Sequence, residues 1–308
     1  EKTGQNTAWV ARQLAQWANV PARNVSYAGL KDRHAVTEQW LSVHLPKGET
    51  PDFSAFLAQY PNIEILATDR HNKKLRPGDL VGNGFVVTLS EVTDIADVER
   101  RLEKIKQVGV PNYFGAQRFG NDGNNLEEAR RWGRENVRTR NQNKRSMYLS
   151  AARSCIFNRI VSARLEQGMF DKFVEGDVAQ TSAGNVTVDA SNIAAMQAQF
   201  IDGDAAITAA LAGDNALPTQ ADALALEQPF LDEEPDLMAL IRGNRMRHDR
   251  RAVKLYPNNL KWELKESEVT VSFELSSGSF ATSVIRELIN EIAFERVFDQ
   301  TTDERSKN

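Results

Sequence analysis

Apolar residues at every second position predict strands near both ends of the chain. Residues 268–275, EVTVSFEL, alternate between apolar and polar side chains, which is typical of a strand with one buried face. Residues 39–45 alternate in a similar way, and short apolar runs predict further strands at 24–29, 63–67 and 85–89. Strand-rich segments therefore lie at both ends of the sequence.

Apolar residues three and four positions apart predict helices between and after these strands. The pattern is present in residues 6–18, 52–59 and 94–107, and in a last helix at 280–298. Ser279 stands just before this last helix, where a serine hydroxyl can cap the first free N–H groups. We therefore predict Ser279 as its N-cap.

The middle of the chain has a different composition. Residues 124–167 are rich in arginine, residues 190–230 are rich in alanine and acidic residues, and both stretches predict mostly helix. The simplest topology is an α+β domain, formed by residues 1–107 and 256–308, that is interrupted by an inserted domain of residues 108–255. We expect this insert to be mostly helical.

Charge is unevenly distributed along the chain, although the formal net charge is only −4. Residues 101–165 hold 14 Lys and Arg against 5 Asp and Glu, residues 166–240 hold 1 against 14, and residues 241–261 hold 7 against 1. Such segregation predicts a basic face beside an acidic one, and a basic face can neutralise phosphates. The alternative is a set of helices with solvated arginine faces.

Several features argue against other classes of protein. The sequence has no apolar run long enough to span a membrane and no apolar core of a signal peptide near its start. Cys155 is the only cysteine, which fits a reducing cytoplasm and a buried structural role. The four histidines are scattered and no metal-binding spacing occurs, so we expect no metal.

The first candidate site is the segment YAGLKDRHAVT at 27–37. It places the carboxylate of Asp32 between the cations of Lys31 and Arg33, with His34 beside them, on a loop that follows a strand. Nearby cations favour the ionised carboxylate, which can act as a nucleophile or a general base. A solvated surface turn is the alternative.

The second candidate is GNGF at 82–85. Phe85 could stack on a base and Asn83 could hydrogen-bond to a ligand. A turn followed by a core phenylalanine explains the same residues.

The third candidate is PNYFGAQRFG at 111–120, which combines three aromatic residues, an arginine and two glycines. Aromatic and guanidinium planes are surfaces on which unpaired bases stack. The residues of interest are Asn112, Phe114, Gln117, Arg118 and Phe119. A tightly packed hinge between domains is the alternative.

The fourth candidate is GSFATSVIR at 278–286, where Arg286 lies off the apolar stripe of the predicted helix. It could reach Asp32 as a paired cation. The alternative is an exposed helix arginine.

These segments occur in the order found in one family. SYAGLKDRHAVTEQW, KLRPGDLVGNGF, VPNYFGAQRFG and SGSFATSVIREL, together with NKRSMYLSAARS and LYPNNLKW, make the chain resemble the TruD family of tRNA pseudouridine synthases over nearly its whole length. The family pattern also has an N-terminal segment, which supplies a strand and a basic residue near the active cleft and which we expect to be missing before Glu1.

The resemblance implies roles for the candidate residues. Asp32 is the catalytic aspartate, Arg286 is its basic partner, and Phe85 stacks on the target base. The residues implied to contact substrate are Lys31, Arg33, His34, Asn83, Phe85, Asn112, Phe114, Gln117, Arg118 and Phe119. The fold implied is the mixed, mainly antiparallel sheet of pseudouridine synthases, interrupted by the family's own insert.

The resemblance also implies an activity. The expected reaction is the cofactor-free isomerisation of uridine 13 of tRNA by a monomeric cytoplasmic enzyme, with the base flipped out of its stack. Two alternatives stay open: the same chemistry on another RNA, and an inactive relative that binds RNA or acts as an RNA chaperone. A metal-dependent hydrolase is a third class, which a chelator would test.

Overall fold

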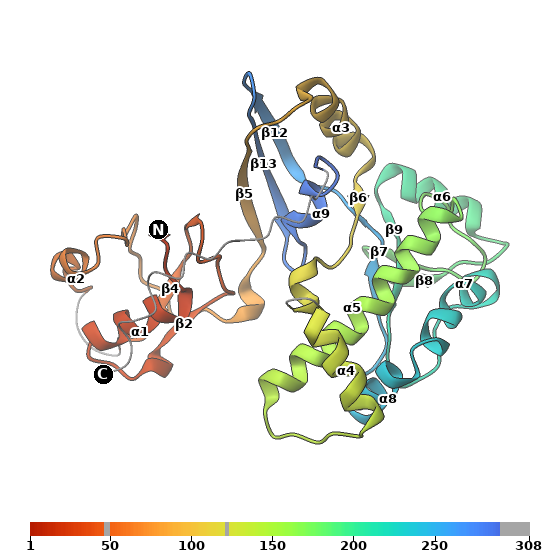
Figure 1. Cartoon of the computed structure of the whole chain (residues 1–308), viewed down its shortest axis with the longest axis horizontal. Coiled ribbons are helices and arrows are strands. Elements are labelled where there is room, and N and C mark those ends of the chain that lie inside the picture. Colours follow the sequence, from red (N-terminus) through yellow and green to blue (C-terminus); the bar gives the residue numbers. More distant parts are fainter. Residues whose placement is uncertain (46–49, 121–122, 290–308) are drawn as a thin grey trace. The chain divides into compact units, whose positions relative to one another are not determined.

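The computed structural model describes residues 1–45, 50–120 and 123–289. The chain divides into two compact units, Glu1–Gly82 and Asn83–Asn308. Figure 1 labels many of the elements of both units. Each unit has its own hydrophobic clusters and is treated by itself below.

The first unit is built from short elements. They are β1 (Lys2–Thr3), α1 (Thr7–Trp17), the 3-10 turn Ala22–Asn24, β2 (Val25–Tyr27), β3 (Val36–Thr37), β4 (Leu41–Val43), α2 (Ser54–Gln59) and the 3-10 turn Pro77–Asp79. β1 pairs antiparallel with β3, and β2 pairs antiparallel with β4. Helix α1 begins where the Asn6 side chain accepts a hydrogen bond from Ala8 N–H, as an N-cap does.

The apolar face of α1 forms the core of this unit. Val10 and Leu14 pack against Phe56 of α2, which is completely buried. The ring of Trp17 stacks on Phe53, with the ring centroids 4.9 Å apart. Full burial of a side chain such as Phe56 contributes roughly 1.5–3 kcal/mol to stability, so these few contacts fix α1 against α2.

The second unit contains a three-stranded sheet in the order β12-β13-β5. Its elements are β5 (Gly82–Leu89), α3 (Ile95–Val108), β6 (Val110–Pro111), β11 (Lys254–Leu255), β12 (Asn258–Leu264), β13 (Val269–Ser276) and α9 (Ala281–Ile285). The alternation predicted for 268–275 is confirmed, because Val269, Val271 and Phe273 are buried and the residues between them are not. These side chains form one core with Leu102 of α3 and Val284 of α9.

The same unit also contains a four-stranded antiparallel sheet in the order β10-β9-β7-β8. The elements around it are the 3-10 turn Ala116–Phe119, α4 (Asn124–Arg134), α5 (Gln142–Glu166), β7 (Val178–Thr181), β8 (Gly184–Thr187), α6 (Ile193–Asp202), β9 (Ala205–Leu211), α7 (Ala221–Asp232), α8 (Pro235–Gly243) and β10 (Asp249–Ala252). Helices hold more of these residues than strands do.

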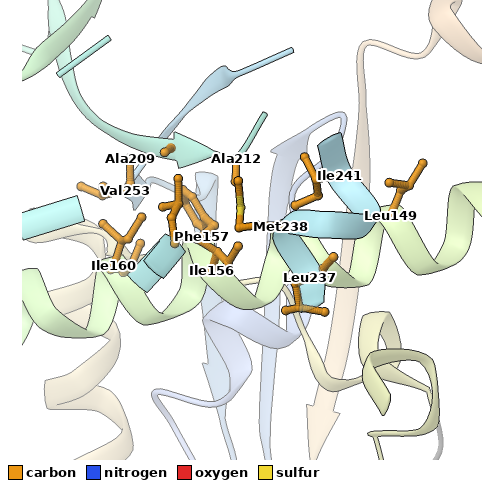
Figure 2. Packing of buried hydrophobic residues seen from close by; sticks show 14 of the residues in the cluster. Leu149, Ile156, Phe157, Ile160, Ala209, Ala212, Leu237, Met238, Ile241 and Val253 are labelled. Atoms are coloured by element: carbon orange, nitrogen blue, oxygen red, sulfur yellow. The ribbon is translucent and has the colours of Figure 1, made fainter. Parts of the chain in front are cut away.

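Helix α5 runs through the core of this region. Figure 2 shows Ile156, Phe157 and Ile160 of α5 pointing toward Ala209 of β9, with Met238 of α8 beside them. The three α5 side chains are completely buried. Small alanines on β9 let the bulky side chains of α5 approach the sheet, which is how close packing is reached here.

Three local predictions are wrong. Residues 63–67 form no strand, and only Ile63 makes an isolated bridge, to Lys2. The last helix begins at Ala281 with Phe280 in the N-cap position and no capping side chain, so Ser279 is not the N-cap. Within the predicted helix 280–298, α9 ends at Ile285, and residues 290–298 lie outside the described residues.

Ion pairs connect the basic stretch of the sequence to the acidic stretch. Arginines of the basic stretch pair with carboxylates of the acidic stretch, as in Arg130–Glu234 at 2.8 Å and Arg134–Asp236 at 2.9 Å. These carboxylates therefore neutralise part of the basic stretch, and a basic face beside an acidic one stays a prediction.

One of these ion pairs is completely buried. The guanidinium of Arg164 donates two hydrogen bonds to the carboxylate of Asp177, both at 2.8 Å, and neither side chain is exposed. Arg164 also donates to the carbonyls of Met169 and Lys172, and Asp177 accepts from Val174 N–H. These hydrogen bonds offset the free-energy cost of removing both charges from water.

Candidate active site

Asp32 lies at the surface of the first unit, in the turn between β2 and β3. Its carboxylate Oδ1 accepts a hydrogen bond from the backbone N–H of His34 at 2.9 Å. Aspartate side chains stabilise turns in this way. The carboxylate is therefore exposed to solvent and still oriented by a hydrogen bond.

The side chain of Lys2 holds the backbone of the same turn. Lys2 is only 4% exposed, and its ammonium donates hydrogen bonds to the carbonyl of Asp32 at 2.9 Å and of Gln5 at 2.6 Å. Burial lowers the pKa of Lys2, the negative charge of Asp32 raises it, and the positive charge of Lys31 lowers it. Lys2 is thus a cation that interacts with Asp32 through both its charge and a hydrogen bond.

The two ends of the turn are fastened to the start of α1. The hydroxyl of Thr7 accepts a hydrogen bond from Lys31 N–H at 3.1 Å and donates one to the side chain of Gln39 at 2.8 Å. The Gln39 amide in turn donates to the carbonyl of Gly29 at 3.2 Å. Gly29 has a φ of +96°, a conformation that favours glycine, so this residue lets the chain enter the turn.

The residues predicted around Asp32 have different environments. Arg33 and His34 are exposed, whereas Lys31 is half-buried and burial lowers the pKa of its ammonium. Sequence reasoning missed Lys2, because a lysine thirty residues before an aspartate gives no spacing signal.

Phe85 lies on β5 in the second unit. Its ring is half-buried and stacks on Phe273 of the neighbouring strand, with the centroids 5.5 Å apart and the planes inclined by 28°. Ile285 of α9 packs against the same cluster. Asn83 lies two residues earlier on β5. These contacts are those of a core phenylalanine, and stacking of a base on Phe85 stays a prediction.

Hydrogen bonds fix the segment that follows β6. Asn158 of α5 accepts from Phe114 N–H and donates to the Phe114 carbonyl, both at 2.9 Å. The hydroxyl of Ser283 in α9 donates to the carbonyl of Tyr113 at 2.8 Å. Asn112 is buried and donates to a carbonyl of β10 at 2.9 Å. The predicted hinge is therefore held by α5, α9 and β10 together.

Two guanidinium groups lie over the ring of Phe114. The Cζ of Arg251 is 4.2 Å from the ring centroid and that of Arg118 is 5.5 Å away. Arg118 also lies 5.4 Å from the centroid of Phe280. Guanidinium planes bind aromatic faces in this manner. The structure thus brings Asn112, Phe114 and Arg118 together, and it adds Arg251, which sequence reasoning missed.

The two guanidiniums raise the local positive charge. Burial lowers the pKa of Arg251 to about 10, and the charge of Arg118 acts in the same direction. Burial also lowers the pKa of Arg118. Arg251 donates to Asn112 Oδ1 at 2.6 Å and to the carbonyl of Gly278 at 2.9 Å, both neutral acceptors. An anion is therefore the partner that this cluster lacks among the residues the structure describes.

Arg286 ends α9 and is exposed. Its Cζ lies 4.8 Å from the ring centroid of Tyr113. Gln117 is exposed on the 3-10 turn Ala116–Phe119, and Phe119 is half-buried there. Asp32 belongs to the first unit, whereas Phe85 and Arg286 belong to the second, so the approach of Asp32 to these two side chains stays a prediction.

Within residues 1–45, 50–120 and 123–289, no group of three or more His, Cys, Asp or Glu could hold a metal ion. No helix among the same residues is long and apolar enough to cross a membrane.

Comparison with known proteins covers almost the whole chain. The profile of the family described as tRNA pseudouridine synthase D (TruD) matches residues 1–129 and 124–288. The tRNA pseudouridine synthase D of Vibrio campbellii is 77% identical over 297 residues, which are 96% of this chain and 86% of that protein. The protein of the same name from Vibrio cholerae is 64% identical over 307 residues, 100% of this chain and 85% of that protein.

A solved structure shares the fold. A crystal structure described as a tRNA pseudouridine synthase D (TruD) from Methanosarcina mazei has a TM-score of 0.67 and 22% identity, and it covers 92% of this chain and 85% of that one. The α+β fold and the family match define an isomerase, a pseudouridine synthase. The chain belongs to the tRNA pseudouridine synthase D (TruD) family.

Proposed function

We propose that this protein isomerises uridine 13 of tRNA to pseudouridine, and that Asp32 is its catalytic carboxylate. The observation that carries the proposal is the turn at Asp32. Its carboxylate is exposed, oriented by His34 N–H, and accompanied by the buried cation of Lys2. The turn lies within the GLKD segment through which the chain resembles its family.

The chemistry needs one ionised carboxylate and no imported group. Isomerisation breaks the bond between N1 of uracil and C1′ of ribose and forms a bond between C5 and C1′. C5 loses its hydrogen and N1 gains one, so that substrate and product contain the same atoms and nothing is oxidised. We propose that the reaction needs no cofactor, and that Asp32 acts as a nucleophile or as a general base.

The uridine has to leave its stack before Asp32 can reach it. Flipping a base costs a few kcal/mol, which contacts of the protein with the base and the backbone offset. We propose that Phe85 stacks on the flipped uracil. The support is its ring, half-buried on β5 and already rigid against Phe273, since a rigid aromatic platform loses little entropy on binding.

Arg286 is proposed as the partner of Asp32. A cation beside a carboxylate favours its ionised form and orients it. The exposure of Arg286 and its position over Tyr113 are compatible with this role, because the guanidinium is not engaged with a carboxylate of the described residues.

Further contacts with RNA are proposed for the other candidates. Arg118, stacked on Phe114, combines a positive charge with an aromatic face, as single-stranded RNA requires. Arg251 joins them because it lies over the same ring. The remaining residues proposed to contact RNA are Lys31, Arg33, His34, Asn83, Asn112, Gln117 and Phe119.

We also propose that residues 108–255 are an insert in a catalytic domain formed by residues 1–107 and 256–308. The two cores of the second unit support this division. One core takes residues from Val98 to Val110 and from Leu255 onward, and the other takes residues from Ala129 to Val253. We propose further that the enzyme acts as a monomer in the cytoplasm, where tRNA is its partner.

Mapping pseudouridine in cellular RNA tests the substrate. In cells that lack this protein, tRNA should have uridine at position 13, and expression of the protein should restore pseudouridine there. Restoration at another position or in another class of RNA would contradict the proposed target while leaving the chemistry intact. No change at any position would favour an inactive RNA-binding relative.

A further inference from the structure

Arginines in the second unit fall into two groups. Arg130, Arg131 and Arg134 of α4, like Arg159 and Arg164 of α5, form ion pairs with carboxylates. Three others, Arg138, Arg145 and Arg245, form no ion pair with a carboxylate of the described residues. These three line one surface cavity of about 260 Å³.

The cavity is formed where two loops meet. The loop between α4 and α5 contributes Arg138, the first turns of α5 contribute Arg145, and the end of α8 contributes Gly243 and the adjacent Arg245. Arg138 donates a hydrogen bond to the carbonyl of Gly243 at 2.7 Å. A Cβ at Gly243 would lie 3.4 Å from the Arg138 guanidinium, so glycine leaves this group room over the helix end.

No carboxylate lines this cavity, so its charge is uncompensated. Charges of one sign repel one another when they are close together. A bound anion would remove this repulsion. Guanidinium groups bind phosphate oxygens through paired hydrogen bonds, which favours phosphate among the possible anions.

Arg245 has an unusual backbone at the rim. Its φ is +51°, in the left-handed region that residues other than glycine and asparagine seldom adopt. Its side chain makes no hydrogen bond or ion pair with the described residues that would account for an arginine here. The guanidinium of Arg245 is therefore available to a ligand at the cavity.

We propose that this cavity binds a phosphate of the RNA backbone and forms a second contact with tRNA, apart from the predicted site residues. The inference rests on the proposed function, because it takes RNA as the substrate. Trp132 at the cavity is 6% exposed and packs edge to face on Tyr148, 4.7 Å between centroids. It therefore has no free face for a base, and recognition of a phosphate is favoured over that of a nucleobase.

The test is Arg245→Asn, which removes the charge and places a residue that tolerates the left-handed conformation. Binding of a tRNA transcript is measured between about 50 and 200 mM salt, and each lost phosphate contact should reduce the slope of log K against log salt by about 0.7–0.9. We expect about three- to tenfold weaker binding, an unchanged or higher Tm, and unchanged turnover at saturating RNA. Arg145→Gln should behave alike.

The matched control is Arg131→Gln, which makes the same change in net charge at an arginine already paired with Glu128 and Glu135. It should leave the salt slope unchanged. Equal affinity and slope in Arg245→Asn and the wild type would overturn the inference. A second result would also overturn it: inorganic phosphate stabilises the wild type but not Arg245→Asn, while both proteins bind tRNA equally well. A small phosphate compound would then be the ligand.

The readouts keep the two proposals distinguishable. Binding and its salt slope test the cavity, and release of tritium from RNA labelled at C5 of uridine tests the reaction. Tritium release by the wild type, together with identical salt slopes for the wild type and Arg245→Asn, would contradict only the proposed phosphate site. A lowered salt slope in Arg245→Asn, together with no tritium release by the wild type, would contradict only the proposed reaction.

Discussion

The buried ammonium of Lys2 donates a hydrogen bond to the backbone carbonyl of Asp32 at 2.9 Å. The backbone of the turn that carries the proposed catalytic carboxylate is thus held by a cation thirty residues earlier in the chain. Lys2 acts as a positioning residue in this account, because its contact is with the backbone of Asp32 and not with a substrate.

Replacement of Lys2 by methionine should therefore damage catalysis. A hydrogen bond to a charged group contributes about 1.5–3 kcal/mol, so we expect kcat to fall by about tenfold or more while KM for tRNA changes little. The change is measured by tritium release at saturating RNA. Lys104→Met, at an exposed position of α3, is the control and should keep full turnover. Equal kcat in both variants would remove the positioning role.

The buried pair of Arg164 and Asp177 should carry much of the stability of its region. Asp177→Asn leaves the guanidinium buried without its counter-charge, and we expect a loss of about 3–5 kcal/mol in the free energy of unfolding. Urea unfolding measures this loss. Glu135→Gln breaks the exposed pair with Arg131 and should lower the free energy of unfolding far less, because solvent screens exposed ion pairs. Similar losses in the two variants would mean that burial does not govern these pairs.

Arg286→Leu tests the proposed partner of Asp32. Removal of a cation that orients a carboxylate should reduce kcat more than affinity, because the interaction is needed in the reaction step and not for holding the RNA. We expect kcat to fall at least tenfold, which corresponds to about 1.4 kcal/mol of activation free energy. The Kd for tRNA should change less than threefold. A variant that loses affinity alone would assign Arg286 to RNA binding.

Regular patterns in the sequence predicted a large part of the fold. The alternation at 268–275 and the helical periodicity at 6–18 and 94–107 correspond to β13, α1 and α3, because each of these elements buries one face. In contrast, β9 has the sequence AAITAAL within a stretch that suggested helix. Alanine favours helices in isolation, but here pairing with β7 and β10 and packing under α5 decide the conformation.

Local sequence patterns could not predict which distant residues pair with one another. The acidic stretch gave no sign that Glu234 lies beside Arg130, or that Asp177 lies beside Arg164, because ion pairs depend on tertiary proximity and not on spacing. Arg251 and Lys2 escaped notice for the same reason. Asp32, Phe114 and Arg118 could be selected as candidates, since dense local combinations of charge, aromatic rings and glycine mark them in the sequence, and their roles stay predictions.

The central claim is that the carboxylate of Asp32 performs the isomerisation. Asp32→Asn keeps the size of the side chain and an oxygen that can accept from His34 N–H, so the turn should persist while the ionisable group is lost. Tritium release from C5-labelled tRNA is the direct measurement, with tRNA binding measured alongside. We predict no detectable release and normal binding, and turnover near that of the wild type would contradict the account.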